Sequence, residues 1–237
     1  MTRDTGTLYG IGLGPGDPEL MTLKAHRLIA GASVIAYPAP QDGASFARAI
    51  AAAVIPDTAR EIRIDIPMDT ARYPAQAAYD GAAEEIAGLL AAGQDVMLLC
   101  EGDPFFYGSF MYVFARLSDR FTVEVVPGVT SVTACAAALQ RPLSARNEVL
   151  TIIPGTLAEA DLAARVAAAD ALAIMKVGRH LPKIRRVLAA AGLLEQAGYI
   201  ERASLPNQVM APLADAPEIA PYFSMILVTK GADPWLA

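Results

Sequence analysis

The sequence predicts a two-domain α/β protein with mainly parallel or mixed sheets. Short apolar segments alternate with helical patterns along the chain, and glycine- and proline-rich loops follow several of the apolar segments. A polar segment at residues 140–147 separates two such series. Such alternation is typical of parallel α/β architecture. With 237 residues, 54% of them hydrophobic and 19% charged, the chain has enough apolar side chains for full cores.

In the first half, apolar segments predict strands at residues 8–13, 34–37, 61–66, 95–100 and 122–126. Helical periodicity predicts helices at residues 20–30, 44–53, 75–92, 111–117 and 129–139. Pro38 and Pro40 are expected to end the second strand, and Gly93 to end the long helix. The segment 95–100 is apolar throughout, which is typical of a strand covered on both faces, whereas 61–66 alternates and is expected at the periphery.

The second half repeats the strand and helix alternation in a shorter form. Strands are expected at residues 149–153, 171–176, 199–203 and 223–229, and helices at 157–168 and 181–191. The final strands are expected to be partly antiparallel. The polar, proline-containing segment QRPLSARNE before this series predicts a domain boundary, which gives domains 1–142 and 143–237.

Composition excludes several classes of function. The formal net charge of −6 and the lack of dense basic clusters disfavour a nucleic-acid partner. No apolar run approaches the roughly 18 residues of a membrane span, and no signal peptide is visible, so a cytoplasmic protein is expected. Cys100 and Cys135 lie in apolar contexts and are expected to be buried free thiols. Two histidines and two cysteines far apart offer no metal-ligand spacing, so no metal is expected.

A glycine loop, GIGLGPG at residues 10–16, follows the first strand. A dinucleotide-binding turn is one interpretation. Two details disfavour it: Pro15 has no N–H where that turn needs donors, and the second strand ends without the acidic residue that holds a ribose. Two interpretations remain for these residues: a purely structural turn, or a loop that lets a ligand lie flat against the backbone.

A second loop, EGDPFFYG at residues 101–108, directly follows the buried strand. It therefore lies at a carboxyl end, where open α/β sheets bind ligands. Glycines permit close approach, Asp103 before Pro104 fixes a turn, and three aromatic residues give flat apolar surfaces. These features suit a ligand with a cationic centre and a purine. The plainer alternative is an Asp-Pro turn with core aromatics.

Two further strand ends carry polar groups. In VPGVTS, residues 126–131, Thr130 and Ser131 can cap the next helix or donate to a ligand. In the second half, Met175 and Lys176 end one strand, and residues 201–204 end another. Met175 is also a common core filler. The basic residues after it form either a basic rim or a solvated face.

In this order, the segments GIGLGPGDPELMTLKA, EGDPFFYG, VPGVTSVTACAAAL and IMK resemble the tetrapyrrole (precorrin) methylases, which use S-adenosylmethionine. The resemblance runs from about residue 8 to residue 228. Within the family, the chain is most similar to members that methylate precorrin-2 at carbon 20, through YPAPQDGASFARAIA, GSFMYVFARL, LSARNEVLTIIPGTL, MKVGRHLPKIRRVL and YIERASLPNQ. The uroporphyrinogen methylases carry an acidic residue straight after the second strand, where this chain has Pro38.

The resemblance implies the class III S-adenosylmethionine methyltransferase fold, with two αβα domains, donor and substrate in the cleft between them, and a homodimer. The reaction it implies is conversion of precorrin-2 to precorrin-3A in cobalamin biosynthesis. Tyr107 is implied beside the methyl group, as a donor contact and as the one catalytic candidate. The other donor contacts it implies are Pro15, Glu101, Gly102, Asp103, Phe106, Thr130, Ser131, Met175 and Ala203.

A reduced tetrapyrrole is an electron-rich enamine, so its meso carbon needs little activation, and no indispensable general base is expected. The substrate bears many carboxylates while the protein is acidic, so basic residues should concentrate around the cleft. The candidates are Arg141, Arg146, Lys176, Arg179 and His180.

Rival interpretations stay open. A family member could act on a cobalt-containing or later precorrin, on an rRNA nucleotide or on a modified histidine. The pI of about 5.0 disfavours rRNA. A nicotinamide-dependent dehydrogenase rests on the first glycine loop alone, and a non-catalytic binding module would not require donor loops from both halves.

Overall fold

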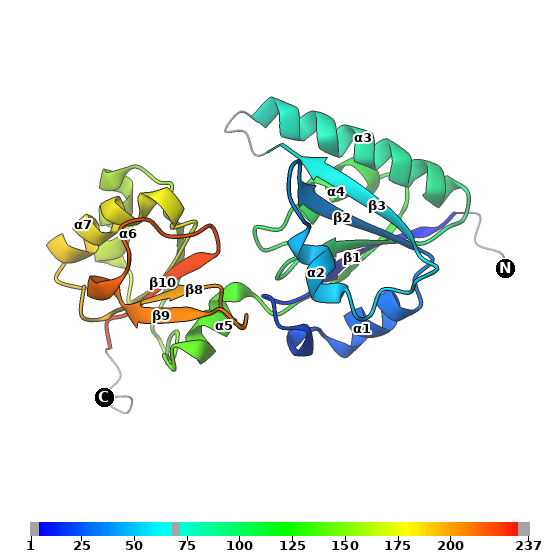
Figure 1. The fold of residues 1–237 in the computed structure, drawn as a ribbon. Coiled ribbons are helices and arrows are strands. Elements are labelled where there is room, and N and C mark those ends of the chain that lie inside the picture. Colours follow the sequence, from blue (N-terminus) through cyan, green and yellow to red (C-terminus); the bar gives the residue numbers. More distant parts are fainter. Residues whose placement is uncertain (1–4, 68–71, 232–237) are drawn as a thin grey trace. The chain divides into compact units, whose positions relative to one another are not determined.

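The computed structural model describes residues 5–67 and 72–231, and the chain divides into two compact units, Met1–Thr130 and Ser131–Ala237 (Figure 1). Helix α5 (Ser131–Ala138) belongs to the second unit, where it contacts β10 (Ser224–Thr229). The sequence places the domain boundary after residue 142, beyond this helix, and that boundary stays a prediction.

The first unit alternates strands and helices as the sequence predicts. Its elements are β1 (Thr7–Gly12), the 3-10 turn η1 (Pro18–Leu20), α1 (Leu23–Ala30), β2 (Val34–Pro40), α2 (Phe46–Ala51), β3 (Arg60–Ile66), α3 (Arg72–Ala91), β4 (Val96–Cys100), α4 (Phe110–Leu117) and β5 (Thr122–Val126). The helix expected from residue 20 begins at Leu23, because Thr22 caps it by accepting a 3.1 Å bond from Ala25 N–H.

The first sheet is parallel in every pair, with the order β3-β2-β4-β1-β5. Helices α1 and α2 pack on one face through residues such as Ile11, Ile29 and Leu99. Helices α3 and α4 cover the other face through residues such as Ile86 and Phe110 (Figure 1). This double covering explains why β4 is apolar throughout.

The chain changes direction across this sheet between β1 and β4. From β1 it passes through α1 to β2 on one side, and from β4 it passes through α4 to β5 on the other side. Ligands of open α/β sheets bind at such a reversal, beyond the carboxyl ends of the strands. The loops after β1 and β4 therefore flank the expected binding crevice.

The expectation that Pro38 ends the second strand is wrong. Strand β2 continues to Pro40 and pairs with β3 as far as Ile66. Beyond Ala36, β2 pairs only with β3 and no longer with β4, so this stretch is in effect an edge. Proline is tolerated there because the missing N–H interrupts no second ladder.

The second unit is shorter and its sheet is mixed. Besides α5 and β10 its elements are β6 (Leu150–Pro154), α6 (Glu159–Ala168), β7 (Ala171–Met175), the turn η2 (Gly178–His180), α7 (Leu181–Ala190), β8 (Ala197–Glu201), β9 (Val209–Pro212) and the turn η3 (Leu213–Asp215). The strand order is β6-β7-β10-β8-β9, and β10 runs antiparallel to both neighbours, which confirms the expected antiparallel pairing. Strand β9 has no counterpart among the predicted elements, because its residues are mostly exposed and show no apolar alternation.

Both faces of the second sheet are covered. Helices α6 and α7 pack on one face through residues such as Leu162, Ile184 and Tyr199. The other face contacts α5, and a Cβ built on Gly198 of β8 would lie 3.2 Å from the side chain of Leu139. Strands β6, β7 and β8 run in the same direction, so their carboxyl ends share one edge.

Candidate functional site

Three strand-end loops of the first unit meet through glycine backbones. A Cβ built on Gly128, after β5, would lie 2.0 Å from the carbonyl oxygen of Gly102, after β4. A Cβ built on Gly12, at the end of β1, would lie 2.5 Å from the amide nitrogen of Gly128. Real Cβ atoms do not tolerate such distances, so only glycine permits this close approach.

The loops after β1 and β4 are also hydrogen-bonded to each other. Gly14 N–H donates to Gly102 O at 3.2 Å, and Gly102 N–H donates to Gly14 O at 2.8 Å. Both glycines have positive φ, +82° at Gly14 and +64° at Gly102, a conformation that glycine adopts without strain. The first glycine loop is thus part of a two-loop structure rather than an isolated dinucleotide turn.

Asp103 ties the second loop to the third. One carboxylate oxygen accepts from Phe105 N–H at 2.9 Å, and the other accepts from Gly128 N–H at 3.1 Å. The first bond forms the turn that the Asp-Pro sequence predicts. The second bond gives Asp103 a positioning function, and its predicted contact with the donor remains a prediction.

Glu101 is the first residue of the second loop, and its carboxyl contacts helix α2. Burial raises the pKa of its carboxyl above the ordinary value, while hydrogen bonds from the backbone N–H groups of Glu101 and Ala47 oppose that rise. Ala47 is a buried residue near the start of α2. The second loop therefore contacts the segment that follows β2 as well as the loops that follow β1 and β5.

The aromatic residues of the second loop divide into two groups. Phe105 packs edge-on against Phe114 with ring centroids 5.0 Å apart, so it extends the core of α4 even though it is 48% exposed. Phe106 and Tyr107 form a separate edge-on pair at 5.3 Å. Tyr107 is 47% exposed and has a positive φ of 57°. The loop thus keeps flat apolar surface accessible beside its glycines.

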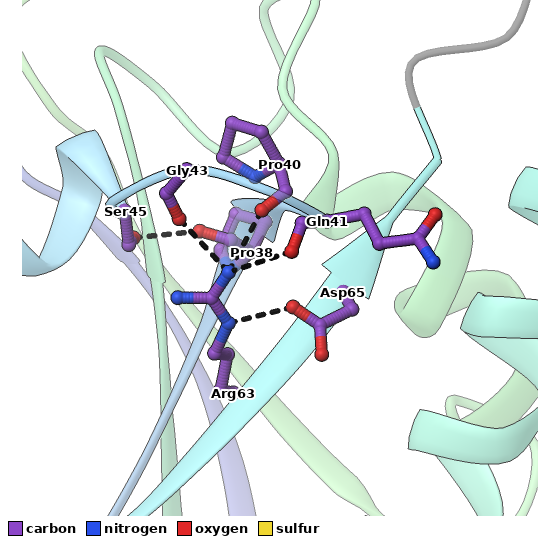
Figure 2. Close-up of polar contacts among 7 residues, drawn as sticks. All are labelled: Pro38, Pro40, Gln41, Gly43, Ser45, Arg63 and Asp65. Atoms are coloured by element: carbon purple, nitrogen blue, oxygen red, sulfur yellow. Dashed lines mark hydrogen bonds and ion pairs between the residues drawn. The ribbon is translucent and has the colours of Figure 1, made fainter.

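The loop after β2 is held by an arginine from the neighbouring strand. Figure 2 shows Arg63 of β3 reaching over this loop: its Nη2 donates to Pro40 O and Gly43 O at 2.8 Å each and to Gln41 O at 3.4 Å. Its Nε donates to Asp65 Oδ1 at 2.6 Å. Of the described loops of the first sheet, this one lies beside the second loop on the side away from β1.

At the shared edge of the second sheet, two of the predicted donor contacts follow neighbouring strand ends. Met175 ends β7, and its carbonyl accepts from Gly155 N–H at 2.7 Å. Ala203 lies in the turn after β8 and is half-buried. The backbone is left-handed at Lys176, Arg202 and Ser204, with φ between 50° and 68°, although none of them is glycine.

A buried carboxylate supports the turn after β8. Glu201 is 7% exposed and accepts from Tyr199 Oη at 2.7 Å and from Arg202 Nη2 at 2.6 Å. Burial and the bond to Glu201 raise the pKa of Tyr199. Arg202 Nε also donates to Asn207 O at 3.1 Å, so the turn is fixed at both ends.

The basic residues expected around the substrate are divided between opposite edges of the second sheet. Arg141 donates to the carbonyl of Gln196, just before β8, and Arg146 precedes β6. Lys176, Arg179 and His180 instead follow the carboxyl end of β7. A five-residue strand separates the two sets by about 15 Å. Only the second set shares an edge with Met175 and Ala203, and burial together with Lys183 and Arg179 lowers the pKa of His180 there.

Several residues of the site have no place among the predicted contacts. Gly12, Gly14 and Gly128 are the main ones, and the glycine at each successive strand end was the available signal. Arg63 and Glu201 had no comparable signal, because their partners depend on the fold.

Other expectations concern thiols, metals and membranes. Cys100 and Cys135 are buried and free, as predicted, and burial raises their pKa values to about 11 and about 12. Across residues 5–67 and 72–231, no three histidine, cysteine or acidic residues gather as metal ligands would. None of the helices in the described part of the chain has the length and apolarity of a membrane crossing.

Comparison with known proteins places this fold and these loops in a family. The family model of Tetrapyrrole (Corrin/Porphyrin) Methylases matches residues 7–217. The chain is 45% identical to a precorrin-2 C(20)-methyltransferase of Sinorhizobium sp, covering 96% of this chain and 97% of that protein. It is 32% identical to a cobalt-precorrin-2 C(20)-methyltransferase of Salmonella typhimurium, covering 95% and 97%.

Solved structures agree with the same assignment. The uroporphyrin-III C-methyl transferase of Thermus thermophilus, solved in complex with S-adenyl homocysteine, superposes with a TM-score of 0.68 at 26% identity, covering 95% of this chain and 92% of that one. The predicted α/β fold class, the resemblance and the methyltransferase class are thereby confirmed. The chain belongs to the tetrapyrrole methylase family.

Proposed function

We propose that this chain transfers a methyl group from S-adenosylmethionine to carbon 20 of precorrin-2 and so forms precorrin-3A in cobalamin biosynthesis. The 45% identity with the Sinorhizobium enzyme over nearly the full length of both proteins supports this acceptor. The observation that carries the donor assignment is the meeting of Gly12, Gly102 and Gly128 at the carboxyl edge of the first sheet. A side chain at Gly12 or Gly128 would push these loops apart, and with them the peptide groups that we propose as donor contacts.

The described residues of the first unit fit a sulfonium donor. Asp103 holds the second and third loops together, which fixes the peptide groups that face the crevice. The rings of half-buried Phe106 and exposed Tyr107 suit a purine or a methyl sulfonium, and a cation is attracted to aromatic faces. The donor contacts at Pro15, Thr130 and Ser131 and, in the second unit, at Met175 and Ala203 are part of the proposal.

When bound, the donor supplies an electrophilic methyl group. In the reaction, carbon 20 forms a bond to that methyl carbon, the bond from sulfur to methyl breaks with its electron pair going to sulfur, and carbon 20 loses a proton. The chain's own contribution is alignment in a site from which water is excluded, and alignment alone supplies about 7–11 kcal/mol in favourable cases. We propose no indispensable general base, because the acceptor is already nucleophilic and water can take the proton.

The test is anaerobic incubation of the protein with S-adenosylmethionine and precorrin-2, followed by mass spectrometry and carbon NMR. The expected product carries one new methyl group at carbon 20. Methylation elsewhere, or none, contradicts the proposal. A single substitution that abolishes turnover while both binding constants stay intact would contradict the absence of a general base.

Cobalt-precorrin-2 is the second candidate acceptor, supported by the 32% identity with the Salmonella enzyme. The same incubation with the cobalt-containing substrate compares kcat/KM for the two. A cytoplasmic homodimer is also part of the proposal, and light scattering after size-exclusion chromatography tests the dimer.

A further inference from the structure

The turn after β8 has a conformation that its sequence disfavours. Leu205 N–H donates to Arg202 O at 3.0 Å, so Ala203 and Ser204 lie at the centre of a four-residue turn. The φ angle is positive at Ser204, +68°, and not at Ala203. A positive φ at the second central residue alone is the pattern of a type II turn, which ordinarily has glycine there. With serine in this place, the type II form carries a conformational cost.

A side chain from beyond the turn stabilises this costly form. Gln208 Oε1 accepts from Ser204 N–H at 2.8 Å. Type I and type II turns differ mainly by a half-rotation of the central peptide group, here the one that joins Ala203 to Ser204. In the type I form, φ at Ser204 would be negative and its N–H would point away from Gln208. The bond to Gln208 therefore opposes a rotation that serine would otherwise favour.

The same bond orients the carbonyl group of Ala203. In a planar trans peptide, the C=O of one residue and the N–H of the next point in opposite directions. Because Ser204 N–H faces Gln208, Ala203 C=O faces away from it. The ladders of β8 end at Glu201, and no group among residues 5–67 and 72–231 donates to Ala203 O. Half-buried Ala203 thus offers an acceptor of fixed direction at the carboxyl edge of the second sheet.

Other bonds attach the turn to the sheet. Arg202 N–H donates to Phe223 O at 2.8 Å, and its Nε donates to Asn207 O at 3.1 Å. Its Nη2 donates to the buried carboxylate of Glu201 at 2.6 Å. None of these three bonds involves the central peptide group. Loss of the Gln208 side chain should therefore leave the turn attached to the sheet and free that peptide group to rotate.

We propose that Gln208 is a positioning residue that directs the Ala203 carbonyl toward the amino group of the donor's purine. This inference rests on the proposed function, in which Ala203 and Met175 contact S-adenosylmethionine. The purine carries an uncharged amino group that donates to a carbonyl, and its flat face suits the apolar side chain of Met175, which ends β7 at the same edge. The turn would then select a 6-aminopurine against an oxopurine.

The test measures how well the protein distinguishes two ligands by calorimetry. S-Inosylhomocysteine has an oxo group where S-adenosylhomocysteine has the amino group, and an oxo group repels a carbonyl. We expect wild-type protein to bind S-adenosylhomocysteine at least about tenfold more tightly, which corresponds to about 1.4 kcal/mol. In Gln208→Ala, the ratio of the two Kd values should fall toward one. A general loosening of the fold would weaken both ligands alike and leave this ratio unchanged.

Three further variants separate the hydrogen bond from the rest of the side chain. Gln208→Met keeps a side chain of similar length without the acceptor, so it should lose selectivity even if Gln208→Ala fails to fold. Gln208→Glu keeps an acceptor oxygen for Ser204 N–H and should keep the wild-type ratio. Asn207→Ala is the matched control: it removes the neighbouring amide but keeps the carbonyl that accepts from Arg202. It should leave both Kd values unchanged.

The serine allows a rescue experiment. Glycine adopts a positive φ without strain, so Ser204→Gly should favour the type II form even without the bond to Gln208. Combined with Gln208→Ala, it should restore most of the selectivity. By itself, Ser204→Gly should keep the wild-type ratio.

Several outcomes overturn the proposal. One is a wild-type ratio near one, and another is a ratio that neither Gln208→Ala nor Gln208→Met lowers. A third is a double variant no more selective than Gln208→Ala. Wild-type protein that binds neither ligand contradicts the proposed donor, and this inference with it. Protein that binds S-adenosylhomocysteine selectively but does not methylate precorrin-2 contradicts the proposed acceptor alone.

Discussion

The loops at the carboxyl edges of the two sheets differ in the residue types at their left-handed backbone positions. In the first unit, the left-handed turns fall on glycines such as Gly14 and Gly102, with Tyr107 as an exception, and the loops touch backbone to backbone. In the second unit they fall on Lys176, Arg202 and Ser204, although left-handed backbone costs a residue with a side chain on the order of 1 kcal/mol. The first edge brings the peptide groups of neighbouring loops close to one another, whereas the second keeps side chains at a conformational cost.

The largest effect should come from adding one carbon to the first edge. Gly128→Ala places a Cβ 2.0 Å from Gly102 O, so the second and third loops must separate. We expect loss of detectable S-adenosylmethionine binding by calorimetry and a destabilisation of about 2–3 kcal/mol in urea unfolding.

Gly88→Ala is the matched control, because a Cβ at this exposed position of α3 meets nothing within 4 Å. It should stabilise the chain by about 0.5–1 kcal/mol and leave donor affinity unchanged. If Gly128→Ala still binds S-adenosylmethionine, the contact between the glycine loops is not needed for donor binding.

At the carboxyl edge of the second sheet, the stability of the turn after β8 should depend on side-chain hydrogen bonds. Glu201→Gln removes the charge that holds Arg202 at 2.6 Å while keeping an acceptor for Tyr199. Because the carboxylate is buried, we expect a loss of about 1–2 kcal/mol in urea unfolding. Glu159→Gln breaks an exposed pair with Arg186 at 2.7 Å and should lower the free energy of unfolding much less, because solvent screens that pair. Equal losses would show that the buried network does not stabilise the turn.

Lys176 allows backbone and side-chain roles to be separated. Lys176→Gly and Lys176→Ala both remove the ammonium group, but only glycine fits a φ of 54° without strain. The glycine variant should therefore be more stable than the alanine variant by about 1 kcal/mol, with the same rise in KM for precorrin-2 in both. A KM that differs between the two variants would show that backbone conformation, and not the charge, matters for the substrate.

The smallest effect concerns the buried carboxyl of the first edge. Burial raises the pKa of Glu101, so the folded chain holds this proton more tightly than the unfolded chain does. The stability that comes from the raised pKa is present at low pH and is lost as pH rises through that pKa. Glu101→Gln should therefore be more stable than wild type at neutral pH, with the difference vanishing in acid. Thermal midpoints across pH measure this, and a difference that grows in acid has the wrong sign.

Much of the first unit is predictable because its signals are local. Continuous apolar runs mark the parallel strands, and loops rich in glycine mark their ends. The contact between Gly12 and Gly128 is not local, since it depends on β1 lying between β4 and β5. The extension of β2 through Pro40 depends likewise on which neighbour pairs with it.

In the second unit, local patterns carry less information. Strand β9 is short and exposed, so it gives no periodic signal. The basic candidates were grouped by sequence and by charge, yet sheet direction decides which of them share an edge. That is why Arg141 and Lys176 lie apart although each fits an acidic substrate. The contacts of Arg63 cross 20 to 23 residues to Gly43, Gln41 and Pro40, beyond any helical or strand period.

The glycine contact also determines when a nascent chain can complete the proposed donor site. Its members come from residues 12, 102 and 128, so the last of them emerges from the ribosome only after more than half of the chain has been made. Contacts this distant in sequence form late, because the intervening loops must close first. In a chain interrupted before residue 128, most of the first sheet is present but the proposed donor site is incomplete.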